Sequence, residues 1–247
     1  MSTSTDLQPV KGRNLDGPET ETIDLYLAYI LADTSFSVAE FMTVVNEGTN
    51  GAIDLLARHS AVTDQIRLSV LSFSDDAHIE IPAASPNNIL TDAHLVANGS
   101  TNYHTGFDLL AATIPSDLAA LVAERDRLQA ETGRKHRIVR PAVFMVSDGA
   151  PTDGRKAWKA SYDALMRLSA CPNIVTFGVE DADEQVMREI ATVRHYQAED
   201  GADVAAVIQE TFAAISRSLI DSATAGQGFI FPDQVAGTTA MDPFLDL

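Results

Sequence analysis

Hydrophobic side chains along this chain alternate between a two-residue period and a period near 3.6 residues. Residues 23–32 form an apolar stretch with no charge after Asp24, which predicts a buried β-strand. Residues 38–59 carry apolar side chains at helical spacing and predict an α-helix. Further strands are predicted at residues 66–73, 77–81, 142–146, 173–178 and 194–197, and further helices at residues 107–129, 153–169, 183–191 and 204–220.

This alternation predicts the fold class. Strands that alternate with helices indicate an α/β protein with a doubly wound, mostly parallel central sheet and helices on both faces. Only residues 74–76 separate the strands at 66–73 and 77–81, so we expect one antiparallel hairpin at an edge of the sheet. Residues 82–104 are rich in Pro, Asn, Ser and Gly and predict a long loop, and Pro115 is expected to interrupt the following helix.

The pattern also divides the chain of 247 residues into three parts. Residues 1–20 are polar and are expected to form a flexible N-terminal segment, and residues 21–222 are expected to form one domain. Residues 223–247 are expected to form a C-terminal tail that combines three Phe residues with Pro and Asp. The tail either folds back on the domain or serves as a docking segment.

Composition narrows the function classes. The formal charge of −18 offers no broad basic surface for nucleic acid, since the one basic cluster is Arg134, Lys135, His136, Arg137 and Arg140. We expect that cluster to be a solvated loop, with docking of an acidic segment as the alternative. Cys171 is the only cysteine, and no apolar run approaches the roughly 20 residues that span a membrane. We therefore expect a cytoplasmic protein.

An oxygen-rich run follows the first predicted strand, where Asp33, Ser35 and Ser37 form a D-x-S-x-S pattern. Side chains at the end of a parallel strand lie at the sheet edge where open α/β sheets bind ligands. One carboxylate and two hydroxyls are hard donors that suit Mg²⁺ and suit zinc poorly. Structural roles are the alternative: Ser37 and Glu40 form the S-x-x-E pattern of a capping box, and Ser35 suits a turn.

Two other loops carry similar chemistry. Thr101 lies in the loop at residues 98–102, and Asp148 belongs to the segment 147–153, which directly follows the predicted strand at residues 142–146. The carboxyl ends of parallel strands share one edge, so we expect Asp148 to lie near Asp33. The loop with Thr101 is long enough to reach the same place.

In their order along the chain, these segments resemble the metal-ion-dependent adhesion site of the von Willebrand factor A (vWA) domain family. The family pattern is D-x-S-x-S after the first strand, a threonine in a Gly-rich loop, and an aspartate in a D-G after a central strand. The matching positions are Asp33, Ser35, Ser37, Thr101 and Asp148, and the resemblance covers roughly residues 20–220. Phe36 departs from the pattern, because the family usually has a small residue there.

Residues 147–153 are similar to the S-D-G-x-P-T-D segment of bacterial vWA proteins of the tellurium-resistance type. That resemblance implies a cytoplasmic stress-response protein that works beside kinase-like and phosphatase-like partners. Asp153, the last residue of the segment, is expected to cap the following helix.

The resemblance implies a Mg²⁺ ion, with Ca²⁺ or Mn²⁺ as alternatives. Ser35 and Ser37 would bind the ion directly, and Asp33, Thr101 and Asp148 directly or through water. The ion would hold an Asp or Glu of a protein partner. We therefore expect an interaction module with no catalytic residues.

An enzyme and a scaffold are the alternatives. A phosphatase of the haloacid dehalogenase type needs a second aspartate at the position of Ser35, and the chain has no G-x-S-x-G elbow or Walker P-loop. His104, three residues from Thr101, is expected to have an ordinary loop role. A scaffold subunit of a metal chelatase or ATPase complex would keep the same fold.

Overall fold

The strand β1 (Ile23–Asp33) is buried along nearly its whole length. In the computed structural model, which describes residues 22–244, β1 pairs in parallel with β2 (Ile66–Phe73) on one side and with β5 (Ala142–Ser147) on the other. Alternate side chains of β1 face opposite helical layers, as for Tyr26 and Leu27. Burial on both faces explains why this stretch is continuously apolar in the sequence.

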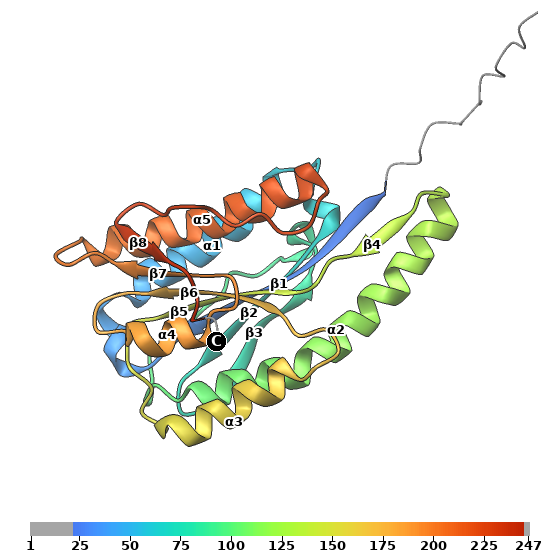
Figure 1. Cartoon of the computed structure of the whole chain (residues 1–247). Coiled ribbons are helices and arrows are strands. Elements are labelled where there is room, and N and C mark those ends of the chain that lie inside the picture. The colour runs from blue at the N-terminus through green and yellow to red at the C-terminus, as the bar shows by residue number, and fades with distance from the viewer. Residues whose placement is uncertain (1–21, 245–247) are drawn as a thin grey trace, which may run out of the picture.

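The sheet has eight strands in the order β3-β2-β1-β5-β6-β7-β8, and the short β4 pairs with the start of β1 (Figure 1). The remaining strands are β3 (Ala77–Ala84), β4 (His136–Ile138), β6 (Asn173–Gly178), β7 (Arg194–Ala198) and β8 (Thr238–Met241). β3 and β8 are antiparallel to their neighbours, and the other pairings are parallel. The predicted doubly wound, mostly parallel α/β sheet is confirmed, and β8 adds a second antiparallel edge that the sequence did not indicate.

Helices cover both faces of the sheet (Figure 1). α1 (Met42–Arg58) and α5 (Val204–Ala225) pack on one face, and α2 (Tyr103–Thr132), α3 (Gly154–Met166) and α4 (Glu184–Ile190) contribute to the core on the other. Three short 3₁₀ helices are η1 (Phe36–Glu40), η2 (Thr63–Gln65) and η3 (Pro86–Asn88). The two helical layers enclose two hydrophobic clusters separated by the sheet.

Two segments differ from the sequence-based expectation. The predicted loop at residues 82–104 is partly ordered, because β3 continues to Ala84 through an irregular pairing with β2 and η3 follows. α2 is not interrupted at Pro115 and runs to Thr132, where Gly133 in the left-handed region (φ 68°) ends it. Tertiary contacts of α2 with α3 and the sheet therefore outweigh the local cost of the proline.

The C-terminal segment from Gly226 to Phe244 folds back on the domain. The Phe229 ring meets the Tyr26 ring edge-to-face at 5.1 Å between centroids, and Phe229 stacks on Phe231. The Gly228 amide donates to the buried Asp24 carboxylate at 3.2 Å. The predicted N-terminal segment at residues 1–20 lies outside the residues that the structure describes.

Asp24 is also the partner of the predicted basic cluster. The Arg137 guanidinium donates two hydrogen bonds to the Asp24 carboxylate, at 2.8 and 2.7 Å, from a side chain that is itself half-exposed. Residues 136–138 of the cluster form β4 rather than a solvated loop. The ion pair fixes the start of β1 to β4 and, through Gly228, to the C-terminal segment.

Within residues 22–244, one helix is long and apolar enough by length and composition to cross a membrane, and this is α2. In the fold, α2 buries Phe107, Leu110 and Ile114 in the cluster that it shares with α3. One face of α2 therefore packs against the sheet and α3, while most of its apolar stretch is not buried.

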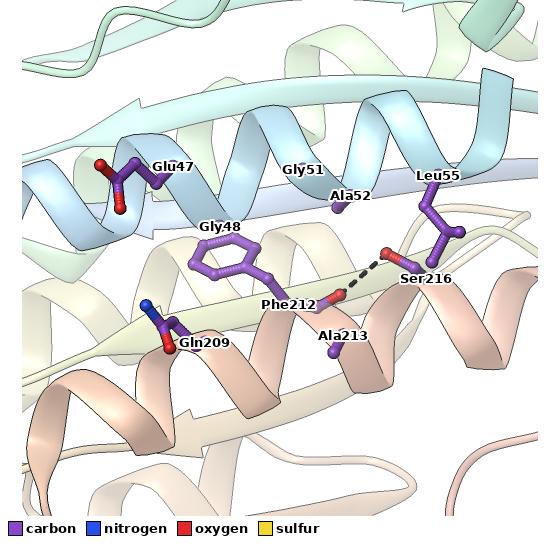
Figure 2. Close-up of a pocket in the computed structure, with 9 residues that line it drawn as sticks. All are labelled: Glu47, Gly48, Gly51, Ala52, Leu55, Gln209, Phe212, Ala213 and Ser216. Carbon is purple, nitrogen blue, oxygen red and sulfur yellow. Dashed lines mark hydrogen bonds between the residues drawn. The ribbon is translucent and has the colours of Figure 1, made fainter. Parts of the chain in front are cut away.

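α1 and α5 approach closely where α1 has no side chain. Figure 2 shows the Phe212 ring of α5 lying beside Gly48 of α1, with the Ser216 hydroxyl bonded to the Phe212 carbonyl oxygen at 2.9 Å. A Cβ atom at Gly48 would collide with the ring, whereas a Cβ atom at Gly51 would meet no heavy atom within 4 Å. The same helix therefore holds one glycine that the packing requires and one that it does not.

We expect Gly48→Ala to lower the free energy of unfolding by about 1–3 kcal/mol, because overpacking outweighs the better helix propensity of alanine. Gly51→Ala is the matched control and should raise it by about 0.5–1 kcal/mol. Urea unfolding followed by circular dichroism measures both. Equal effects of the two variants would contradict the close approach of α1 and α5.

Candidate metal centre

Asp33 and Asp148 lie at the carboxyl ends of two neighbouring parallel strands. β1 and β5 pair up to Ala32 and Val146, so the next residues of both strands emerge at one edge of the sheet. The chain winds from β1 to β2 on one side and from β5 to β6 on the other, which makes this a topological switch point where α/β sheets bind ligands. Both aspartates are buried, with 3% and 2% of their surface exposed.

Both carboxylate oxygens of Asp33 have hydrogen-bond donors. The Ser35 amide donates to Oδ1 at 2.8 Å, and the Ser147 hydroxyl donates to Oδ2 at 2.6 Å. The Tyr103 hydroxyl donates in turn to Ser147 Oγ at 3.1 Å and to the Gly149 carbonyl oxygen at 2.9 Å. Asp33 is therefore held in one orientation by the loop that follows it and by the end of β5.

The two serines connect Asp33's loop to Asp148. Ser35 Oγ lies 2.9 Å from Ser37 Oγ, and the Ser37 hydroxyl donates to Asp148 Oδ1 at 2.9 Å. The other oxygen of Asp148, Oδ2, is buried and has no hydrogen-bond partner among residues 22–244. Neither serine caps η1 or α1 with its side chain, so the capping-box alternative for Ser37 is wrong.

Thr101 completes the group from a third loop. A Cβ atom at Gly149 would lie 3.0 Å from Thr101 Oγ1 and 3.7 Å from Ser37 Oγ, so the two hydroxyls flank the space that the glycine leaves. The Thr101 carbonyl oxygen accepts from the Thr152 amide at 2.9 Å and from its hydroxyl at 3.1 Å. The structure thus brings all five predicted site residues together at one edge.

The site carries two carboxyl groups with no opposing charge. Among residues 22–244, no Lys, Arg or His forms an ion pair with Asp33 or Asp148. Burial, followed by the charge of Asp33, raises the pKa of Asp148 to about 7, and Glu180 adds a smaller effect in the same direction. Burial also raises the pKa of Asp33, against the hydrogen bonds from Ser147 and Ser35. A cation is the partner that would stabilise both carboxylates in their charged form.

The donor set fits a hard divalent cation. Two carboxylates and three hydroxyls supply only oxygen atoms, which suit Mg²⁺, Ca²⁺ or Mn²⁺. The part of the chain that the structure describes holds no group of three or more His, Cys, Asp and Glu side chains that could bind a metal. An ion bound here would give Asp148 Oδ2 a partner, which it lacks among the described residues. The space beside Gly149 would give the ion room.

Sequence reasoning missed several neighbours of the site. Ser147 and Tyr103 belong to it through their hydrogen bonds, and only the S-D-G pattern pointed to Ser147. Asp153 stands at the start of α3 but does not cap it, so that expectation is wrong. Its Oδ2 instead accepts from the His104 amide at 2.8 Å and lies 2.9 Å from His104 Nδ1, at the start of α2.

Phe36 lies between the two serines and is strongly exposed. Phe36 is 69% exposed, although its neighbours Ser35 and Val38 are buried. Its amide donates to the Gly99 carbonyl oxygen at 3.1 Å, which fixes the backbone next to the Thr101 loop. The residue that departs from the family pattern therefore presents an aromatic ring at the surface beside the site.

No protein-family profile matches the chain, and no curated protein sequence is significantly similar to it. Among solved structures, a von Willebrand factor type A protein from Catenulispora acidiphila matches with a TM-score of 0.55 and 16% identity, over 80% of this chain and 43% of that one. The pilus adhesin SpaC from Lactobacillus rhamnosus GG matches with a TM-score of 0.57 and 10% identity, over 82% and 31%. The PilB minor pilin from Streptococcus sanguinis matches with a TM-score of 0.53 and 12% identity, over 90% and 65%.

The chain spans less than half the length of the first two of these structures. At such low identity the similarity concerns the arrangement of strands and helices and not the residues of a site. The α/β architecture described above is therefore a vWA-like fold.

Proposed function

We propose that this chain is a Mg²⁺-dependent protein-interaction module that binds an Asp or Glu of its partner through a metal ion. A vWA-like fold suggests an interaction or adhesion module in general. The finer proposal rests on the group formed by Asp33, Ser35, Ser37, Thr101 and Asp148. The ion, when bound, would supply a cation at which a partner's carboxylate completes the coordination.

One observation carries this proposal. Asp148 Oδ2 is buried without a hydrogen-bond partner among residues 22–244, while Oδ1 of the same carboxyl group accepts from the Ser37 hydroxyl. Ser35 Oγ lies 2.9 Å from Ser37 Oγ, and the Thr101 hydroxyl lies on the other side of the space beside Gly149. A buried carboxylate oxygen without a partner costs about 1–3 kcal/mol or more, so its retention needs a ligand or a proton. The hydroxyl-rich surroundings favour a hard cation over a proton at neutral pH.

Each residue has a distinct part in the proposed site. Ser35, Ser37 and Thr101 present neutral oxygen atoms, so the ion would keep enough positive charge to accept an anionic ligand. Asp33 is oriented by Ser147 and by the Ser35 amide and would hold the ion directly or through water. Ser37 is exposed while Ser35 and Asp148 are buried, which leaves the site open on the side of Ser37.

The cellular setting is a further part of the proposal. The S-D-G-A-P-T-D segment at residues 147–153 supports a bacterial stress system of the tellurium-resistance type, with kinase-like and phosphatase-like partners in the cytoplasm. One of the structural matches, SpaC, is a pilus adhesin, and it favours the same kind of contact in another setting. We propose no catalytic residue, because Ser35 occupies the position where a phosphatase of the haloacid dehalogenase type needs its second aspartate.

We expect Mg²⁺ to stabilise the wild-type protein against thermal unfolding and Ser35→Ala to lose about half of that response or more. A ligand at 100 times its dissociation constant stabilises by about 2.7 kcal/mol, and loss of one direct oxygen ligand should weaken binding at least about tenfold. Thr34→Val is the matched control, because the Thr34 hydroxyl is also buried in this loop but donates to the Phe73 carbonyl oxygen at 3.1 Å. Differential scanning fluorimetry in MgCl₂ and in EDTA measures both, and an equal Mg²⁺ response in the two variants would contradict the site.

The raised pKa of Asp148 predicts how stability depends on pH in EDTA. The folded state keeps a proton on this carboxyl group up to about pH 7, while the unfolded state loses it near pH 4. The stability due to the protonated form is thus fully present below about pH 4 and is lost as pH rises through about 7.

Asp148→Asn should remove this pH dependence and raise the free energy of unfolding in EDTA at pH 8 by about 2–4 kcal/mol. It should also abolish the Mg²⁺ response. Asp76→Asn, an exposed substitution in the loop after β2, is the control and should change stability by less than about 0.5 kcal/mol. Urea unfolding at several pH values measures this, and a destabilised Asp148→Asn protein would refute the assignment.

Partner capture tests the bridge itself. We expect wild-type protein and Thr34→Val to retain the same partner from a bacterial lysate in MgCl₂ and to release it in EDTA. Ser35→Ala should retain nothing in either buffer. Affinity purification with quantitative mass spectrometry measures this, and partner retention that is unchanged in EDTA would contradict a metal-bridged contact.

A further inference from the structure

An acidic hollow lies at the same edge of the sheet as the candidate metal centre. It has a volume of about 520 Å³ and is formed by the segments that follow β6 and β7. Five of its lining residues are acidic and none is Lys, Arg or His; the acidic ones are Glu180, Asp181, Glu184, Glu199 and Asp200. We call this feature the acidic hollow.

The hollow is continuous with the metal centre along the backbone. Gly178 at the end of β6 pairs with Ser147 at the end of β5, and the Val179 amide donates to the Ser147 carbonyl oxygen at 3.1 Å. Glu180 follows directly. Burial, then the charges of Glu40 and Asp181, raise the pKa of Glu180, so the negative charge of Glu40 in η1 acts on the same group as the hollow.

These charges are not neutralised within the fold. Glu184 forms an ion pair with Arg188 at 3.4 Å, whereas Glu180, Asp181, Glu199 and Asp200 form none within residues 22–244. Like charges held this close repel one another, so the hollow has a strong preference for an external cationic group. Beside it, the buried and unpartnered Asp148 Oδ2 independently marks a place for a ligand.

We infer that the partner segment which offers its carboxylate to the metal centre also carries two or more Lys or Arg side chains that enter the acidic hollow. This inference rests on the proposed function, because the metal centre fixes where the segment binds. A single segment that carries both kinds of charge can bind the metal centre and the acidic hollow together. Its carboxylate would bind the ion, and its basic side chains would pair with the carboxylates of the hollow. A purely acidic segment would be repelled by the hollow and by the formal charge of −18.

A displayed library of random peptides tests this pairing. The library is selected on immobilised protein in MgCl₂, and bound phage are eluted first with EDTA and then with acid. The variant Glu180→Gln/Glu199→Gln/Asp200→Asn removes three charges from the hollow and leaves all five candidate metal ligands in place. The matched control, Asp64→Asn/Asp92→Asn/Asp221→Asn, removes three exposed charges elsewhere.

From the wild-type protein and the control we expect EDTA-eluted peptides that contain an Asp or Glu together with two or more Lys or Arg residues. From the hollow variant we expect peptides that keep the Asp or Glu and lose the Lys and Arg enrichment. Synthetic peptides chosen from the wild-type pool should bind the hollow variant at least about tenfold more weakly in MgCl₂, with a smaller loss at high salt.

The two hypotheses fail in different ways. EDTA-eluted peptides that carry an acidic residue without basic neighbours, or an unchanged Lys and Arg enrichment with the hollow variant, would overturn the role of the hollow and leave the metal bridge intact. A selection in which EDTA releases no enriched peptide would overturn the metal bridge and this inference together. Basic peptides that elute only with acid would show that the hollow binds a cationic chain by itself, which also overturns the joint contact.

Discussion

The parallel pairing of β1 with β5 is the constraint on which the rest of this structure depends. It brings Asp33 and Asp148 to the same edge, where both are buried and neither forms an ion pair within the described part of the chain, residues 22–244. Proteins rarely keep two buried carboxyl groups together unless a proton or a cation resolves the repulsion. The surrounding hydroxyls, the glycine at position 149 and the hydrogen bonds on Asp33 all shape one small space. Two buried carboxyl groups with no opposing charge therefore make the fold less stable than its packing alone would allow.

Local pattern was sufficient to predict six of the eight strands and to place Asp33 and Asp148 at one edge of the sheet. It missed β4 and β8, and the full set of five candidate ligands also needed the resemblance to a known family. The run at residues 23–32 has no alternative to a buried strand, and a D-x-S-x-S that follows such a strand must lie at the carboxyl edge. Asp148 follows a second apolar strand for the same reason. Parallel strands in a doubly wound sheet share that edge, so proximity followed from topology without any knowledge of side-chain contacts.

What the sequence did not indicate depends on contacts between distant segments. Asp153 has the composition of a cap for its own helix, yet its carboxylate serves the first turn of α2, about fifty residues earlier along the chain. β8 pairs with β7 at the far edge, although its four residues show no alternation of apolar and polar side chains. The acidic hollow combines two separate loops, each of which is an ordinary solvated turn in the sequence. Local propensity carries no information on which loops meet, because tertiary packing decides it.

The long helix α2 gives this edge of the sheet a mechanical connection to the opposite edge. Its first turn is held by Asp153 and lies directly after Thr101, and its last turns contact β4, where Gln129 accepts from the His136 amide at 2.9 Å. Thirty residues of α-helix form a rod about 45 Å long. Pro115 removes one backbone hydrogen bond from this rod, so the helix that joins the Thr101 loop to β4 has a locally weaker point between its two ends.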